Sequence, residues 1–154
     1  MVIKRLVNIK IRITSLYYAI TNKKIDSSVR IKSPIIFTNK KIRIGKNSII
    51  GYHARIEEVF SYNQDNFEPS IEIGENVRIE QNLHLTCAYH ISIGNNTAIS
   101  ANVTITDINH MYLDTEIPIE NQNIEVKQVI IGKNCKIYNN SVILPGVIIG
   151  EHVI

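Results

Sequence analysis

Hydrophobic positions recur every six residues through most of the chain. The repeated unit is an aliphatic residue, often a glycine, two polar residues, a small or β-branched residue and one further residue. Copies begin at Ile44, Ile50, Ile73, Ile79, Ile93, Ile99 and Ile131, and weaker copies begin at Ile25 and Ile31. A period of six fits neither an α-helix, which repeats about every 3.6 residues, nor an amphipathic strand, which repeats about every 2 residues.

A solenoid with a triangular coil satisfies this period, because each six-residue unit then forms one side of the triangle. The aliphatic residue points inward and stacks on its equivalents one coil above and one coil below. Glycine or asparagine supplies the positive φ angle that the corners require. The residue four positions later also points inward, beside a corner where space is small. Residues of suitable size occupy this position: Ser48, Ala54, Thr97, Val103 and Cys135.

The spacing between repeat blocks separates regular coils from insertions. Ile73 and Ile93 are 20 residues apart, which is close to the length of one coil with three six-residue sides. The interval from Ile44 to Ile73 is longer and indicates an insertion near 59–70, and the interval from Ile93 to Ile131 indicates a larger loop near 107–126. The sequence therefore predicts an all-β solenoid of about five coils over residues 25–154. Residues 1–24 lie outside the repeat and are expected to form a short helix or a basic cap.

Composition supports an ordered domain and divides its charge unevenly. The chain has 154 residues, 32 isoleucines, no tryptophan and a charged fraction of 20%, which is not a disordered composition. Residues 1–46 hold twelve of the seventeen Lys and Arg residues and one acid, Asp26, so they carry a charge of +11. The remainder carries −8. No recognition motif accompanies the basic segment, so we expect no nucleic-acid partner.

Neither a membrane span nor a secretory signal is expected. No run of about 18 uncharged apolar residues exists, and basic residues interrupt the N-terminal stretch too often for a signal peptide. The two cysteines, Cys87 and Cys135, form neither a disulfide framework nor a metal-binding spacing. Cys135 is interpreted as a small core residue. These features together predict a cytoplasmic protein.

The basic N-terminus has two interpretations. Lys4, Arg5, Lys10 and Arg12 alternate with aliphatic residues. Such a segment suits the anionic inner face of a membrane, close to a lipid-linked glycan. The other interpretation is a solvated cap on the first coil.

Over residues 25–154 this repeat resembles that of the hexapeptide-repeat acyltransferases, and the resemblance implies a left-handed parallel β-helix. Three segments extend the likeness to the sugar O-acetyltransferases, which include the galactoside, maltose, capsule and O-antigen enzymes. The segment Asn102–His110 is similar to the one that ends in their catalytic histidine. Ile117–Glu120 follows the course of their active-site loop, and Ile131–Asn134 and Ile143–Gly150 are similar to parts of the next coil.

The resemblance implies a function and an assembly. Members of this family are homotrimers with an active site in each cleft between subunits, where acetyl-CoA donates an acetyl group to a sugar hydroxyl or, less often, an amine. We therefore expect an acetyl-CoA-dependent O-acetyltransferase acting on a surface polysaccharide or its precursor. One alternative is N-acetylation of a nucleotide-linked amino sugar. Another is an inactive, truncated β-helix that only assembles.

His110 occupies the family's catalytic position. A sugar hydroxyl is a poor nucleophile near neutral pH, and a partly neutral imidazole can take its proton as the new bond forms. The second imidazole nitrogen is usually held by a hydrogen-bond acceptor. Asp107 is the preferred acceptor, with Asp114 and Glu116 as nearby alternatives. For Asp107 the structural alternative is an Asp that closes a turn at the coil edge.

Other site residues follow from the same resemblance. His84 falls where the galactoside enzymes place an acceptor-contacting asparagine, and Asn82 is a weaker candidate of the same kind; both are also interpretable as wall residues of the β-helix. In the cofactor cleft Lys136 and Tyr138 replace the family's usual residues, and Asn139 stands at a position that contacts CoA. No metal is expected, because the closely spaced histidine pair of the γ-class carbonic anhydrases, which share this fold, is absent.

The family pattern also bears on the C-terminus. Ile149–Ile154 forms one side of a coil, whereas the family continues with at least one more coil and a capping tail. These elements help to hold CoA and cover the last strand edge. We therefore expect the sequence to be truncated or to carry an unconventional cap.

Overall fold

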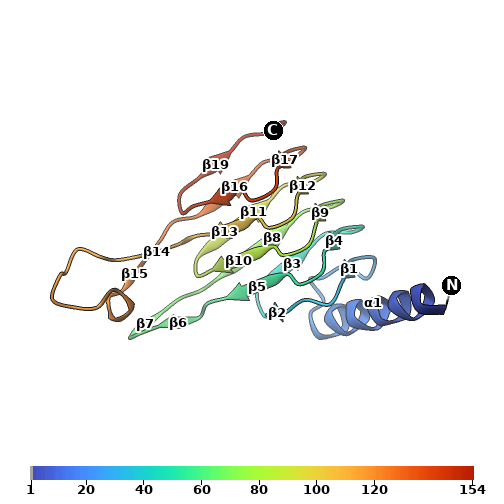
Figure 1. The fold of residues 1–154 in the computed structure, drawn as a ribbon, viewed down its shortest axis with the longest axis horizontal. Helices are drawn as coiled ribbons and strands as arrows, with labels where there is room; N and C mark the ends of the chain where they lie inside the picture. Colours follow the sequence, from blue (N-terminus) through green and yellow to red (C-terminus); the bar gives the residue numbers. More distant parts are fainter. Residues whose placement is uncertain (1) are drawn as a thin grey trace.

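Three parallel sheets form the sides of a triangular β-helix, preceded by helix α1 (Val2–Thr21). The computed structural model describes residues 2–154, and the side chains of Val2 and Lys4 lie outside that description. Figure 1 shows the coils stacked in sequence order from α1 to the C-terminus. The predicted all-β parallel solenoid is confirmed.

Each sheet takes one strand from every coil, so sequence neighbours lie in different sheets. Sheet A contains, in spatial order, β3 (Ile42–Ile44), β8 (Ser70–Ile73), β11 (His90–Ile93), β16 (Val129–Ile131) and β19 (Ile148–Ile149). Sheet B contains β1 (Arg30–Ile31), β4 (Ile49–Ile50), β9 (Arg78–Ile79), β12 (Ala98–Ile99) and β17 (Lys136–Ile137). Sheet C contains β2 (Ile36–Phe37), β5 (Arg55–Glu58), β10 (His84–Cys87), β13 (Thr104–Thr106) and β18 (Val142–Ile143).

The interior consists of columns of aliphatic side chains. In sheet B one column is formed by Ile31, Ile50, Ile79, Ile99 and Ile137, which are in direct register. Each of these side chains is at most 6% exposed. The small residues predicted beside the corners, from Ser48 to Cys135, are also buried. A β-branched side chain has few χ1 states to lose on burial, which suits a position that every coil repeats.

Asparagine supplies most of the positive φ angles at the corners, and histidine, serine and one glycine supply the others. Five residues at the corner between sheets A and B have positive φ: Asn47, Asn76, Asn96, Asn134 and His152. At the corner between sheets B and C the corresponding residues are Ser33, His53, Asn82, Asn102 and Asn140. Within residues 2–154 the glycine with positive φ is Gly146.

The glycines of the repeat serve close packing instead. A Cβ atom on Gly45 would lie 2.7 Å from the carbonyl carbon of Gly74 in the next coil. The expectation that glycine or asparagine turns the corners is thus confirmed for asparagine, which tolerates the left-handed conformation. The repeat glycines instead permit close approach of successive coils.

Helix α1 covers the open edge of the first coil. The hydroxyl of Ser15 accepts a hydrogen bond from the N–H of Ile31 (2.9 Å) and donates to the carbonyl of Ile11 (2.7 Å). Tyr18 packs on Phe37 with ring centroids 4.5 Å apart. Within residues 2–154 no helix is both long and apolar enough to cross a membrane.

Both predicted insertions are present as hairpins. The first contains β6 (Ser61–Tyr62) and β7 (Asp65–Asn66), which are antiparallel. The second contains β14 (Ile108–His110) and β15 (Ile124–Val126), with a short 3₁₀ helix, η1 (Ile119–Asn121), between them. Both leave the β-helix at the corner between sheets C and A, after β5 and β13, and they project on the same side of the stack (Figure 1).

A buried carboxylate stands at the start of each insertion and closes the corner of the preceding coil. Asp107 is fully buried and accepts hydrogen bonds from the N–H groups of Ala88, Tyr89 and His90, each at 2.8 Å. Glu58, two coils earlier and 4% exposed, accepts from the N–H groups that follow Asn39. An ionised acceptor makes stronger hydrogen bonds than a neutral one, which suits a buried corner with several donors.

Replacement of Asp107 by asparagine tests this role. The amide keeps the size of the side chain but directs NH₂ hydrogens at backbone donors, so we expect the free energy of unfolding to fall by about 3 kcal/mol. Chemical denaturation measures the change. The exposed control Glu116→Gln should alter stability by less than about 0.5 kcal/mol, and equal stability of the two variants would contradict the corner-closing role.

Candidate functional site

A cavity of about 550 Å³ lies between the outer face of sheet C and the two hairpins. Strands β5, β10 and β13 form its floor, and β6, β14 and β15 form its rim. Its lining consists of Arg55, Glu57, Val59, Ser61, Tyr62, His84, Thr86, Thr104, Thr106, Ile108, His110 and Ile124. Residues far apart in sequence thus share one concave surface, and His84 and His110 are both part of it.

The floor is polar because alternate residues of sheet C point outward. His84 is in register with Thr104 on one neighbouring strand and with Arg55 on the other. Two residues further along these strands, the hydroxyl of Thr86 donates to that of Thr106 (3.0 Å). Arg55 forms an ion pair with Glu57. The floor therefore offers hydroxyl, imidazole, guanidinium and carboxylate groups, which are the partners that sugar hydroxyls need.

His110 meets Tyr62 at the rim. Nδ1 of His110 lies 3.4 Å from the hydroxyl oxygen of Tyr62, and the centroids of the two rings are 5.3 Å apart in an edge-to-face arrangement. The Tyr62 hydroxyl also lies 2.8 Å from the backbone carbonyl of Glu120 and 3.2 Å from its carboxylate. The first insertion therefore supplies the partner of the histidine that the second insertion carries.

These contacts decide which imidazole nitrogen is free. The single hydroxyl proton of Tyr62 goes to Glu120, because both Glu120 oxygens are acceptors. Burial, and then the charge of Glu120, raise the pKa of Tyr62, so its hydroxyl keeps that proton near neutral pH. The tyrosine oxygen then accepts from Nδ1–H of His110. In the neutral ring this leaves Nε2 unprotonated, and Nε2 is the nitrogen that can act as a base.

The hairpins are held together by amide hydrogen bonds. Asn63 Nδ2 donates to the carbonyl of Gln122 (3.0 Å). The side-chain amide of Gln122, which is buried, donates to the carbonyls of Asp114 (2.7 Å) and Ile117 (2.8 Å). The loop that carries Glu120 is thereby fixed, and so is the contact between Tyr62 and His110.

The structure corrects the expected role of Asp107. Its carboxylate points into the protein and bonds to the backbone of Ala88–His90, whereas Tyr62 contacts the His110 imidazole. Cys87 also donates its thiol hydrogen to Asp107. Burial, and then the Asp107 charge, raise the pKa of the Cys87 thiol far above its usual range, so this cysteine is not a nucleophile.

The other predicted residues lie in two places. Asn82 lies outside the cavity lining, and its side-chain amide donates to Asn102 (2.9 Å) in a ladder along the corner between sheets B and C. Lys136 Nζ lies 5.9 Å from the ring centroid of Tyr138, and Asn139 follows at the same corner. These last three residues belong to sheet B and its edge, so one subunit does not bring them to His110.

Within residues 2–154 no group of three or more His, Cys, Asp or Glu side chains is arranged to hold a metal ion.

The sequence did not indicate three features of the cavity: Tyr62, Glu120 and the Thr86–Thr106 pair. The sequence did indicate that the two hairpins are neighbours, because both insertions start at the same phase of the repeat, but it did not single out Tyr62.

The chain is similar to known transferases. The family model described as bacterial transferase hexapeptide (six repeats) matches residues 128–154. A curated relative, the putative lipopolysaccharide biosynthesis O-acetyl transferase WbbJ of Escherichia coli K12, is 32% identical over 91 residues, covering 54% of this chain and 46% of the relative. The match thus spans less than half of that relative's length.

Two solved structures share the fold. One is AntD, an N-acyltransferase from Bacillus cereus in complex with dTDP and 3-hydroxybutyryl-CoA, with a TM-score of 0.63 and 22% identity over 81% of this chain and 64% of AntD. The other is a variant of AntD in complex with dTDP-4-amino-4,6-dideoxyglucose and coenzyme A, with a TM-score of 0.63 and 20% identity over 81% of this chain and 65% of that one. The chain thus contains hexapeptide repeats and shares a left-handed parallel β-helix fold with these two acyltransferase structures.

Proposed function

We propose that the protein is an acetyl-CoA-dependent O-acetyltransferase whose acceptor is a sugar hydroxyl of a surface polysaccharide or its precursor. The observation that carries the proposal is the placement of His110 on the rim of a polar cavity, with Nδ1 against Tyr62 and Nε2 left to accept a proton. The likeness to an O-acetyltransferase of lipopolysaccharide biosynthesis supports the acceptor class. The cytoplasmic location stays a prediction.

The proposed reaction is direct transfer. Nε2 of His110 removes the proton of the acceptor hydroxyl while its oxygen attacks the thioester carbonyl. A tetrahedral intermediate forms, the carbon–sulfur bond breaks, and the imidazolium returns the proton to the departing thiolate. The products are the acetyl ester and free CoA. Tyr62 favours the imidazolium in this sequence, because the hydrogen bond from Nδ1–H to its oxygen is stronger when the donor ring is charged.

Acceptor binding is assigned to the cavity floor. His84, Thr104 and Thr106 present polar groups to the same space as His110. Sugar hydroxyls both donate and accept hydrogen bonds, so this mixture holds a sugar better than an apolar floor does. Asn82 has no part in acceptor binding in this proposal, because its side-chain amide donates to Asn102 along the corner between sheets B and C.

Donor binding requires a second subunit in this proposal. Lys136, Tyr138 and Asn139 lie at the edge of sheet B, away from the cavity. A homotrimer that sets this edge beside the sheet C cavity of a neighbour would bring them to His110 of that neighbour. Lys136 would then face a CoA phosphate, and Tyr138, which is 59% exposed, would pack on the cofactor.

N-acetylation of a nucleotide-linked amino sugar is the second candidate. The solved neighbours favour it, since they are described as N-acyltransferase complexes with dTDP or a dTDP amino sugar. An amine that binds unprotonated needs less help from a base than a hydroxyl does. A panel of hydroxyl and amino-sugar acceptors therefore separates the two candidates by their rates of thiol release.

Replacement of His110 by glutamine tests the assignment of the base. We expect kcat for acetyl transfer to fall by about a thousandfold, since a positioned general base contributes that order of rate. Release of CoA thiol with the best acceptor of the panel measures it. His53→Asn, at a corner outside the cavity where later coils carry asparagine, is the control and should keep full activity.

Full activity of His110→Gln would refute the base assignment. If the wild-type protein released no thiol with any acceptor and gained no stability from CoA, both enzyme candidates would be refuted. An assembly protein without catalytic activity would then remain.

Replacement of Tyr62 by phenylalanine tests the positioning contact. The ring stays in place but Nδ1–H loses its acceptor, so kcat should fall by about tenfold with little change in KM. The acidic limb of the pH profile of kcat should also move to lower pH, because the His110 imidazolium loses an acceptor that stabilises it. Tyr112→Phe, whose side chain is 64% exposed, is the control and should leave both quantities unchanged. An unchanged pH profile for Tyr62→Phe would reject the positioning role.

A further inference from the structure

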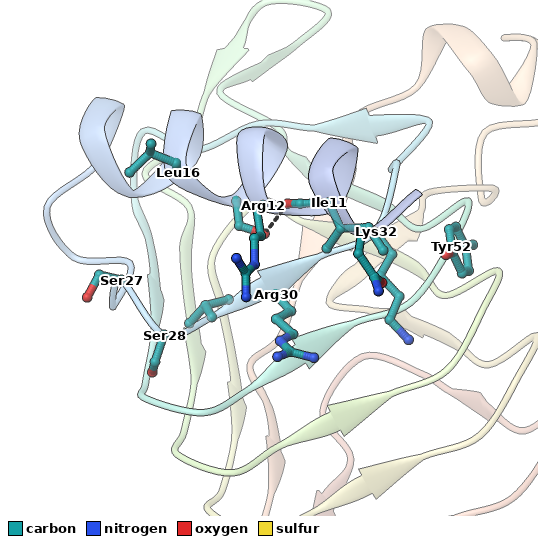
Figure 2. Close-up of a pocket in the computed structure, with 11 residues that line it drawn as sticks. Ile11, Arg12, Leu16, Ser27, Ser28, Arg30, Lys32 and Tyr52 are labelled. Atoms are coloured by element: carbon teal, nitrogen blue, oxygen red, sulfur yellow. Dashed lines mark hydrogen bonds between the residues drawn. The ribbon is translucent and has the colours of Figure 1, made fainter. Parts of the chain in front are cut away.

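A second cavity, of about 580 Å³, lies between α1 and the first coil. Figure 2 shows Arg12 reaching from α1 toward the side where Arg30 and Lys32 project from the first coil. The hydroxyl-bearing residues Ser27 and Ser28 also line this cavity. This second cavity is separate from the proposed catalytic site, because none of its lining residues belongs to the cavity at His110.

The cavity concentrates positive charge that no ion pair balances; Lys32 Nζ lies 5.5 Å from the ring centroid of Tyr52, which also lines the cavity. Within residues 2–154 neither Arg12 nor Arg30 nor Lys32 forms an ion pair, and no acidic residue lines the cavity. Asp26, the acid nearest in sequence, accepts hydrogen bonds from Ser28 and lines a different cavity. Three like charges around one concave space repel each other, so the free energy of the site falls when an anion enters.

Phosphate is the anion that this set of donors fits. A guanidinium presents paired N–H groups that match two oxygens of a phosphate, and an ammonium adds a point charge. We propose that the cavity binds the phosphate group of a phosphate ester or diphosphate, with Arg12, Arg30 and Lys32 as its cationic ligands. This proposal does not rest on the acetyl-transfer function, because the site lies outside the His110 cavity.

Helix α1 has an exposed apolar face beside the cavity, and this face bears on the source of the phosphate. An apolar stripe runs along this face at helical spacing and consists of Leu6, Ile9, Ile13, Leu16 and Ile20, each between 46% and 68% exposed. Leu16 also lines the cavity, so stripe and cavity are continuous. Residues 2–21 contain no acid. A phospholipid headgroup and a free phosphate ester are therefore the two sources that an experiment must separate.

Calorimetric titration of the protein with inorganic pyrophosphate tests the site itself. We expect saturable binding, and we expect Arg30→Gln to weaken it by about tenfold through loss of a charge-assisted hydrogen bond. Arg78→Gln is the matched control, because Arg78 has the same outward orientation in sheet B, two strands from Arg30 and outside the cavity. Both variants remove one surface charge, so only a specific site distinguishes them.

Vesicle sedimentation identifies the source. Phosphatidylcholine vesicles with and without phosphatidic acid are compared, using the wild type and Ile13→Ser. A lipid source predicts binding to the phosphatidic acid vesicles alone, competition by pyrophosphate, and a loss in Ile13→Ser that leaves pyrophosphate binding unchanged. A soluble source predicts pyrophosphate binding without vesicle binding. The proposal is overturned if the wild type binds neither probe, or if Arg30→Gln and Arg78→Gln weaken binding equally.

Discussion

The fold depends on the stacking of each residue on its equivalent in the next coil. Parallel pairing keeps that register through all three sheets, so one choice of residue is repeated from coil to coil. Isoleucine fills the interior columns, and asparagine side chains donate to one another along the corners, as from Asn82 to Asn102 and from Asn102 to Asn140. The same register makes any two insertions at one phase of the repeat emerge at one corner.

The candidate site follows from that last property. Neither hairpin alone makes it: Tyr62 comes from the first insertion and His110 from the second, with one uninterrupted coil between their points of departure. The intervening corner must close tightly, and Asp107 closes it from within. A residue beside the site thus secures the backbone, while a tyrosine two coils away positions the imidazole.

The sequence predicted the coils, the interior positions and both insertions, because each depends on local spacing. A motif also pointed to His110, and a family resemblance pointed to His84; both line the same cavity, and their roles stay predictions. The sequence did not predict Tyr62, because a contact between two insertions depends on hairpin conformation, which the repeat does not encode. The role of Asp107 was misjudged because proximity in sequence to His110 says nothing about the direction of a side chain at a corner.

The central claim is that Tyr62 holds His110 as a base with Nε2 free. Nitrogen-15 NMR of labelled histidine reports the tautomer directly and needs no knowledge of the acceptor. Above the pKa of the imidazole, the His110 signal should show a proton on Nδ1 and none on Nε2, and Tyr62→Phe should shift the population toward the other tautomer. A wild-type His110 that carries its proton on Nε2 would contradict the claim.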